Sequence, residues 1–258
     1  MPVFIERRAR VGAWFDECRR WPARLRIRGR GVLPIVERNS HISPGAKWVA
    51  LSIDDGPSKE TTPALLRALK AHCVNATFFV LGSRAEENLS LVRDIVKDGH
   101  DVYAHGYSHR RFDRMTTEEI LDEIERTEAL LRTLRPTPSR YFVRTPHGAG
   151  AFDPHVHEAL RRWNPSTCLA QWSISTRDWK ISRRCRSAAQ VQSKCAAAVD
   201  RIMNHPRLSG SIILLHDAPV GGEGEFVTEV SEMLLARLLR ALHEDGYAVG
   251  MLKEAIED

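Results

Sequence analysis

Two adjacent carboxylates, Asp54 and Asp55, end the apolar run Trp48-Val49-Ala50-Leu51-Ser52-Ile53 and precede Gly56-Pro57. Adjacent side chains on an extended segment point to opposite sides, so the two acids must have different roles. One can bind a metal ion while its neighbour handles protons. The Gly-Pro pair turns the chain and leaves both acids at a strand end, where α/β enzymes keep their chemistry. A turn without function is the simpler interpretation, so the hypothesis depends on partners elsewhere.

Two histidines supply such partners. His105 and His109 stand four residues apart in His-Gly-Tyr-Ser-His, a spacing that lets both imidazoles face one ion. With Asp55 they form a set of two histidines and one carboxylate. A histidine pair alone is more often a surface coincidence, which is our interpretation of His155 and His157. Three protein ligands leave positions open for water and substrate, which is typical of a catalytic metal site.

The segments that would position these residues alternate between strand-like and helix-like patterns. The predicted strands are residues 49–53, 76–81, 101–104, 141–143, 168–173, 211–215 and 247–251. The predicted helices run from 62 to 72, 89 to 98 and 116 to 135, and from Pro154, Ser187 and Glu229 onward. Such alternation is typical of α/β proteins, in which parallel β/α units wind into a barrel or a doubly wound sheet.

Polar residues follow the ends of several of these strands. They are Asp54-Asp55, His105, Arg144, Asp178-Trp179 and His216-Asp217. Because the carboxyl ends of parallel strands meet at one edge, we expect these side chains to form a single cluster.

Length and composition predict one catalytic domain. The chain has 258 residues and 43% hydrophobic content, enough for one large core. A polar stretch over residues 39–47 resembles a linker, so we predict an N-terminal extension over 1–47 and the domain over 48–258. Five scattered cysteines without a Cys-x-x-Cys pair indicate neither a disulfide framework nor a zinc knuckle.

The basic charge of the chain belongs to the N-terminal extension. Residues 1–47 hold eleven Lys/Arg against four Asp/Glu, whereas the net charge of the whole chain is +5. Residues 11–21 have helical apolar spacing, which predicts either a helix docked on its own domain or contact of residues 1–30 with an anionic membrane surface. No nucleic-acid-binding motif is present, so we expect no nucleic acid partner. Without a secretory pattern at the N-terminus we expect a cytoplasmic protein, free or at the periphery of the membrane.

Five motifs in a fixed order resemble the polysaccharide deacetylases, carbohydrate esterase family 4, which includes chitin and nodulation deacetylases. The motifs are Ser52 to Pro57, His105 to His109, Arg144 to Gly148, Asp178-Trp179, and Leu214 to Asp217. The resemblance covers about residues 48–252. It implies a distorted, incomplete (β/α) barrel of about seven parallel strands. The implied reaction is metal-dependent hydrolysis of an N-acetyl group on an amino sugar.

By this resemblance, Asp54 is the general base, and Asp55, His105 and His109 are the metal ligands. Arg144 would orient Asp54 and hold it ionised. One divalent metal ion is implied, with zinc first and cobalt, nickel or manganese as alternatives, because imidazole and carboxylate ligands suit these ions.

The resemblance also assigns a general acid and a substrate pocket. His216 would protonate the leaving amine, while Leu214 and Trp179 would enclose the acetyl methyl group. The backbone N–H of His147 would stabilise the oxyanion together with the metal, and Pro146 of the same motif would contact substrate. The implied partner is an acetylated amino sugar or oligosaccharide.

Four positions depart from the family pattern. Ser52-Ile53 stands where Thr-Phe is usual, which changes packing only. Gly106 replaces a Ser or Thr, which we expect to loosen the metal site. His147 replaces a Tyr, which we expect to alter substrate preference.

The fourth departure is Ser175, where an Asp that tunes the catalytic histidine is expected. Without that anion the pKa of His216 should be lower than in other family members, unless Asp178 or Asp217 supplies the charge.

Other interpretations remain open at this point. Fe(II) oxygenases also use two histidines and one carboxylate, but in double-stranded β-helices rather than helix-rich α/β folds. A weakened family member that only binds glycans is a second alternative, and another amide or formyl hydrolase a third. The substrate also stays open among chito-oligosaccharides, lipid-linked or nucleotide-linked amino sugars, and small biosynthetic intermediates.

Overall fold

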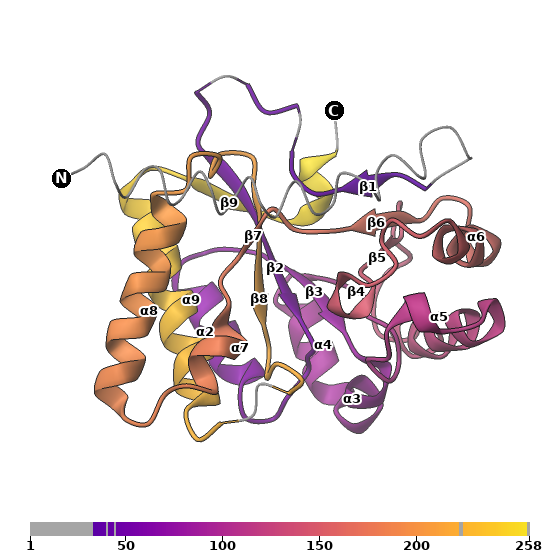
Figure 1. Ribbon diagram of the computed structural model, residues 1–258, viewed down its shortest axis with the longest axis horizontal. Coiled ribbons are helices and arrows are strands. Elements are labelled where there is room, and N and C mark those ends of the chain that lie inside the picture. The colour runs from indigo at the N-terminus through magenta and orange to yellow at the C-terminus, as the bar shows by residue number, and fades with distance from the viewer. Residues whose placement is uncertain (1–32, 40, 44, 222–223, 257–258) are drawn as a thin grey trace.

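A curled sheet of parallel strands forms the centre of the computed structural model, which describes residues 33–39, 41–43, 45–221 and 224–256 (Figure 1). The strands are β1 (Ile35–Val36), β2 (Trp48–Asp54), β3 (Thr77–Val80), β4 (Asp101–Ala104), β5 (Phe142–Val143), β6 (Cys168–Ala170), β7 (Ile174–Ser175), β8 (Ile212–His216) and β9 (Ala248–Gly250). Their order in the sheet is β1-β6-β5-β4-β3-β2-β8-β7, and β9 also pairs with β2. All eight strand pairs of the described chain are parallel. The sheet closes only half a barrel, which confirms the predicted distorted, incomplete (β/α) barrel.

Helices connect the strands on the outside of the half-barrel. They are α2 (Thr62–Ala71), α3 (Gly82–Glu87), α4 (Leu89–Lys97), α5 (Thr117–Leu131), α6 (Pro154–Trp163), α7 (Asp178–Ser182), α8 (Ala188–Met203) and α9 (Val227–Glu244). Helices α8 and α9 lie along one flank, and α5 and α6 along the opposite flank (Figure 1). The helix starts follow local chemistry, because Thr116 and Glu119 form a capping box before α5 and Ser187 caps α8.

The predicted strand over 168–173 was wrong in part. Strand β6 ends at Ala170 beside β5 and β1, and the chain then crosses to β7, which pairs with β8. One apolar stretch of the sequence therefore forms two short strands that lie far apart in the sheet. Helices α3 and α7 were not predicted, because six and five residues are too few for a periodic pattern.

Strand β1 belongs to the segment that we assigned to the N-terminal extension. Ile35 and Val36 pair with Leu169 and Ala170 of β6, and Leu33 and Val36 are buried. The sheet thus takes in residues that precede the predicted domain start at Trp48. The helix and the membrane contact predicted within residues 1–30 lie outside the described residues.

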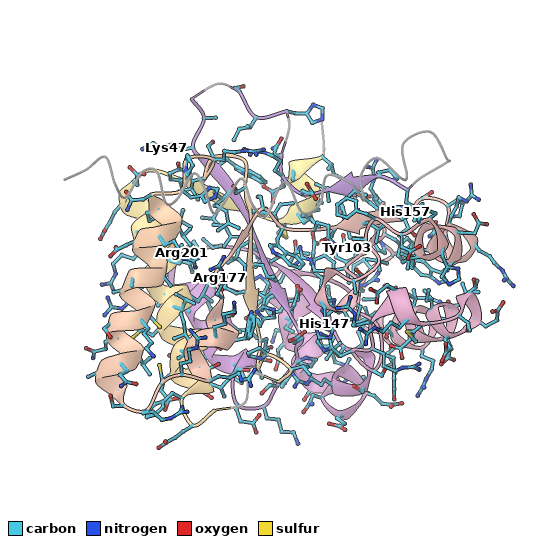
Figure 2. All side chains as sticks on the ribbon, in the orientation of Figure 1. Lys47, Tyr103, His147, His157, Arg177 and Arg201 are labelled. Atoms are coloured by element: carbon cyan, nitrogen blue, oxygen red, sulfur yellow. The ribbon has the colours of Figure 1, made fainter. Side chains whose placement is uncertain are left out.

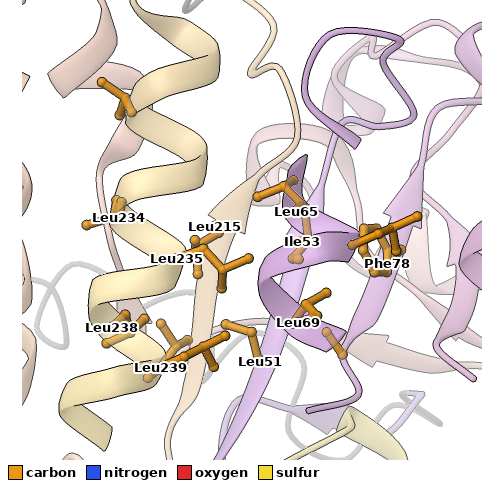
Figure 3. Packing of buried hydrophobic residues seen from close by; sticks show 14 of the residues in the cluster. Leu51, Ile53, Leu65, Leu69, Phe78, Leu215, Leu234, Leu235, Leu238 and Leu239 are labelled. Atoms are coloured by element: carbon orange, nitrogen blue, oxygen red, sulfur yellow. The ribbon is translucent and has the colours of Figure 1, made fainter. Parts of the chain in front are cut away.

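The main hydrophobic core fixes the strand on which the two carboxylates stand. Strand β2 is buried from Val49 to Asp54, as expected for a parallel strand covered on both faces. Figure 3 shows Leu51 and Ile53 of β2 among the leucines of α2 and α9. Full burial of one such side chain contributes about 1.5–3 kcal/mol, so the carboxyl end of β2 is held rigidly in place.

Two further features bear on the protein class. Within the described ranges, no helix combines the length and the apolar content needed to cross a membrane. Cys73, Cys168, Cys185 and Cys195 are free thiols, as expected, and the last three are buried. Cys18 lies outside the described residues.

Candidate metal centre and active site

The predicted polar cluster forms at the carboxyl ends of β2, β8, β4 and β5, which lie in one stretch of the sheet with β3 between β4 and β2. Asp54 ends β2 and pairs in register with His216, which ends β8. His105 follows β4 and Arg144 follows β5 directly. Figure 2 labels His147, which lies on the side of the molecule where these strands end. Sheet topology thus brings together residues that are far apart in the sequence.

Asp55, His105 and His109 form the expected set of three ligands. Their ligand atoms all lie within 4.8 Å of one another. Oδ1 of Asp55 lies 3.4 Å from Nε2 of His105 and 3.3 Å from Nε2 of His109. Nδ1 of His105 lies 2.8 Å from the carbonyl oxygen of Arg144, which directs Nε2 toward the carboxylate. Backbone support of this kind orients metal-ligating histidines.

The chemistry of these donors fits a divalent ion. Oδ1 of Asp55 is buried and has no hydrogen-bond partner within the structure, which is costly unless a cation takes that place. Burial alone would raise the pKa of Asp55, but the neighbouring imidazoles of His105 and His109 hold it well below its ordinary value. Two imidazole nitrogens and one carboxylate oxygen match a zinc-type site with open positions.

The backbone at Asp55 is held in an unusual conformation by its neighbours. Its φ angle is 74°, in the left-handed region that few non-glycine residues adopt. Arg84 of α3 donates hydrogen bonds to the carbonyl oxygens of Asp55 at 2.9 Å and Ala218 at 2.6 Å. The backbone N–H of Val220 donates to Oδ2 of Asp55 at 2.8 Å. These contacts leave Oδ1 as the oxygen available to a metal.

Asp54 is fixed by a fully buried arginine. Nη1 of Arg144 donates to Oδ1 of Asp54 at 2.7 Å and to the hydroxyl of Ser52 at 2.8 Å. Nη2 of Arg144 donates to the carbonyl oxygen of Gln171 at 3.0 Å. The second carboxylate oxygen, Oδ2, lies 3.8 Å from Nε2 of His105. Asp54 therefore presents one oxygen to the metal centre and keeps the other on Arg144.

His216 has a carboxylate partner, Asp178. Nδ1 of His216 lies 2.8 Å from Oδ1 of Asp178, and the backbone N–H of His216 donates to Oδ2 at 2.6 Å. Burial alone would lower the pKa of His216, but the charge and hydrogen bond of Asp178 raise it to about 9. The imidazole therefore carries a proton at neutral pH, as a general acid requires.

Asp178 takes the place of the anion that is missing at Ser175, so the condition for a lowered pKa of His216 is not met. Ser175 lies in β7, where its hydroxyl accepts a hydrogen bond from the backbone N–H of Arg177 at 3.2 Å. Asp178 supplies the anion, one of the two alternatives considered from the sequence. Asp217 instead accepts hydrogen bonds from the hydroxyls of Thr61 and Thr62.

Comparisons with known proteins agree with this geometry. A family model described as "Polysaccharide deacetylase" matches residues 41–165. A chitooligosaccharide deacetylase of Sinorhizobium fredii is 29% identical over 214 residues, which cover 81% of this chain and 92% of the relative. The chain belongs to the polysaccharide deacetylase family. Its predicted enzyme class, a metal-dependent carbohydrate N-deacetylase, is that of the family, and the parallel α/β fold removes the oxygenase alternative.

Two other members are similar to the chain. The peptidoglycan-N-acetylglucosamine deacetylase PgdA of Listeria monocytogenes is 34% identical over 174 residues, which cover 66% of this chain. The chain spans only 32% of the length of that relative. A solved structure of a CE4 family pseudoenzyme from Bacillus anthracis has a TM-score of 0.67 and 26% identity, covering 86% of this chain and 69% of that chain. The family thus includes proteins named as deacetylases and a protein named as a pseudoenzyme, so the fold alone does not establish activity.

The residues expected to bind substrate surround the same strand ends. Pro146 and His147 form a 3₁₀ turn after β5, and the His147 ring centroid lies 4.3 Å from that of His109. Leu214 is buried and shares a face of β8 with His216, because side chains alternate along a strand. Trp179 follows Asp178 in α7 and is half-buried. The substrate roles of these four residues stay predictions.

Gly106 has a backbone conformation that suits glycine. Its φ angle is +78°, a conformation that glycine adopts without strain. Its carbonyl oxygen accepts a hydrogen bond from the backbone N–H of Gly82 at 3.0 Å. The expected loosening of the metal site by the missing Ser or Thr stays a prediction.

Left-handed backbone gathers around the site. Among the described non-glycine residues six have positive φ, and all but Cys73 stand at or next to the site, namely Asp55, His109, His147, Arg177 and Ala218. Such residues cost of order 1–3 kcal/mol each and are concentrated at functional sites.

Two supporting residues were not predicted from the sequence, Arg84 and Glu123. Glu123 stands on the apolar side of α5 between Ile120 and Ile124, and a carboxylate within an apolar stripe is a signal that could have identified it. Arg84 offered no such signal, because its short helix has no periodic pattern. Among the described residues, the pair His155 and His157 joins no ligand set. The interpretation as a surface pair was wrong for His157, which is buried, and both rings contact backbone carbonyl oxygens.

Proposed function

We propose that this protein is a metal-dependent deacetylase that hydrolyses the N-acetyl group of N-acetylglucosamine units in a glycan. One observation supports the proposal most strongly: a metal-ligand set, a general base and a general acid lie together at the carboxyl ends of the strands. They are the Asp55, His105 and His109 ligand set, Asp54 with its Arg144, and His216 with its Asp178. Amide hydrolysis needs all three, because an amide is a poor electrophile and an amine a poor leaving group.

The metal would be held by Asp55, His105 and His109, with zinc as the proposed ion because imidazole and carboxylate donors suit it. When bound, the ion supplies a Lewis acid that polarises the acetyl carbonyl and lowers the pKa of a water molecule. Oδ1 of Asp55 is the oxygen that the surrounding structure leaves for it.

Asp54 and His216 would move the protons. Asp54 takes a proton from the attacking water through Oδ2, because Arg144 occupies Oδ1. His216 gives its proton to the amide nitrogen as the carbon–nitrogen bond breaks, so that the products are acetate and a free amine. Asp178 raises the pKa of His216, which favours the protonated form that this step requires.

The proposed substrate class is peptidoglycan or chitooligosaccharide. Relatives carry both names, and the chain aligns with 92% of the Sinorhizobium fredii chitooligosaccharide deacetylase. Within this class, His147 should give this protein a glycan preference that differs from that of members with Tyr at this position. Its imidazole is exposed and lies beside the metal ligand His109.

Acetate release tests the proposal. Protein stripped by a chelator and reloaded with zinc should release acetate from chito-oligosaccharides or peptidoglycan fragments, and the stripped protein should not. Asp54→Asn and His216→Ala should lower kcat by about 10²–10⁴-fold while zinc stays bound, since each removes one proton transfer. Arg110→Gln, an exposed change in the same loop region, serves as the control.

A zinc-loaded protein that binds these glycans without releasing acetate would instead support the glycan-binding alternative. Release of acetate or formate from other amides, but not from glycans, would support the amide or formyl hydrolase.

A further inference from the structure

The three residues between the two metal-ligating histidines are held from both sides. On one side, the start of α3 donates two hydrogen bonds to this histidine loop, residues 106–108. The N–H of Gly82 lies 3.0 Å from the carbonyl oxygen of Gly106, and that of Ser83 lies 3.1 Å from the carbonyl oxygen of Tyr107. The carbonyl oxygens of Gly106 and Tyr107 thus have backbone donors.

On the other side, one carboxylate of α5 binds the N–H groups of the loop. Oε2 of Glu123 accepts hydrogen bonds from the backbone N–H of Tyr107 at 2.6 Å and of Ser108 at 2.8 Å. Oε1 of Glu123 accepts a hydrogen bond from the Ser108 hydroxyl. Glu123 is only 6% exposed, so these three bonds form largely out of water.

Stability of α5 alone gives no reason for an acid at this position. Glu123 lies on the buried side of the helix with Ile120, Ile124 and Thr127. Burial of a carboxylate costs several kcal/mol unless donors surround it, and an apolar side chain would avoid that cost. The donors that surround Glu123 all belong to the histidine loop.

We propose that Glu123 is a positioning residue of the metal centre, which sets the conformation of the histidine loop and thereby the metal affinity. Hydrogen bonds to an ionised acceptor are about twice as strong as neutral ones, so the carboxylate fixes residues 107 and 108 tightly. His105 and His109 flank these residues, and their Nε2 atoms can meet one ion only if the loop keeps its path. The inference rests on the metal centre proposed above.

The neighbours of Glu123 fit this role. A Cβ atom on Gly106 would lie 3.1 Å from Oε2 of Glu123 and 3.2 Å from the Phe112 ring, so Glu123 occupies the space beside the glycine. The Arg126 guanidinium stacks on the Tyr107 ring at 3.6 Å, and the Tyr107 hydroxyl donates to Glu86 at 2.6 Å. Helices α3 and α5 therefore hold the loop through backbone and side chain together.

Zinc affinity of the full chain tests the proposal. Competition with a chromogenic chelator gives the zinc Kd of the wild type, Glu123→Gln and Glu123→Ala. Loss of a group that supports metal ligands weakens affinity about 10–100-fold. Glu123→Ala should fall near the upper end of this range. Glu123→Gln, whose amide oxygen can still accept N–H bonds, should fall near the lower end.

Glu128→Gln is the matched control. Glu128 is a second buried carboxylate of α5 and pairs with Arg135 at 2.6 Å, away from the histidine loop. This variant should lose thermal stability and keep the wild-type zinc Kd. The absorption spectrum of the cobalt-loaded protein should change in the Glu123 variants only, because it reports ligand geometry directly.

The outcomes separate this proposal from the proposed function. Wild-type zinc affinity in Glu123→Gln and Glu123→Ala, or equal weakening in Glu128→Gln, would overturn the positioning role and leave the deacetylase intact. If Glu123→Ala does not fold, Glu123→Gln alone decides. A wild-type protein that binds no zinc or cobalt would overturn both proposals.

Discussion

His216 and Asp178 decide how the site responds to pH. The carboxylate raises the pKa of the imidazole to about 9, so a proton is present at neutral pH and is lost as the pH rises through that value. A bound divalent ion acts in the opposite direction, because a nearby cation favours the neutral imidazole. The alkaline limb of kcat/KM in the metal-loaded enzyme should therefore lie at or below about pH 9.

Asp178→Asn should move that alkaline limb to lower pH. The amide keeps a similar shape but removes the charge that stabilises the imidazolium, so His216 loses its proton earlier. Ser175→Asp should leave the limb in place, because Asp178 already serves the histidine. Profiles of kcat/KM against pH for wild type and both variants check this. A limb that moves with Ser175→Asp and stays with Asp178→Asn would contradict the assignment.

Gly106→Ala should destabilise the protein more than Gly246→Ala. Both glycines have positive φ, +78° and +73°, so both variants incur a similar backbone strain of about 1 kcal/mol. Only at Gly106 would the new methyl group meet Glu123 and Phe112, whereas Gly246 has open space. Urea unfolding of the two variants measures the difference in free energy of unfolding. Equal losses would show that the contact with Glu123 does not constrain the loop.

The sequence predicted the ligands and the proton carriers because they are chemically rare groups at fixed spacing and at strand ends. It did not predict Glu123, since α5 carries six acidic residues and any one of them looks like a surface charge until the apolar stripe is aligned around it. The choice between Ser175 and Asp178 depended on side-chain direction after β7. Sequence spacing alone does not give that direction.

At the scale of elements, the N-terminal caps define where the long helices begin. Thr116→Ala and Ser187→Ala should each lower the free energy of unfolding by about 1 kcal/mol, because each side chain accepts a hydrogen bond from the first turn of its helix. Zinc affinity should stay unchanged in both variants, since Glu123 stands in the second turn of α5. Urea unfolding and chelator competition measure the two effects. Weaker zinc binding in Thr116→Ala alone would mean that the first turn of α5 also supports the histidine loop.

The sequence predicted the long helices and most strands, but it did not predict β1, β7, α3 and α7. Strand β4 matches its predicted bounds, Asp101–Ala104, and the predicted capping box precedes α5. Strands β1 and β7 have two residues each, and pairing with distant strands rather than local pattern makes them strands. The sequence did not predict the crossing from β6 to β7 for the same reason. The two strands are close in the sequence, and only their pairing with different strands shows that they are separate.

At the scale of the whole molecule, residues 33–39 should act as part of the folded domain. Removal of residues 1–47 takes away β1 and the buried Leu33 and Val36, which should lower the free energy of unfolding by about 3 kcal/mol or more relative to removal of 1–32. Denaturant unfolding of chains 33–258 and 48–258 makes the comparison. Equal stability of the two would place the domain start at Trp48, as the sequence predicted.

The left-handed residues around the site limit how this enzyme can be changed. Asp55, His109, His147, Arg177 and Ala218 all have φ between 52° and 74°, a range that β-branched side chains avoid. At these positions β-branched replacements should add backbone strain, whereas glycine and asparagine should relieve it. Leu214, Trp179 and Pro146 carry no such restriction of positive φ. Directed evolution toward a new acyl group or a new sugar should therefore vary Leu214, Trp179 and Pro146. The five left-handed residues should be kept as they are.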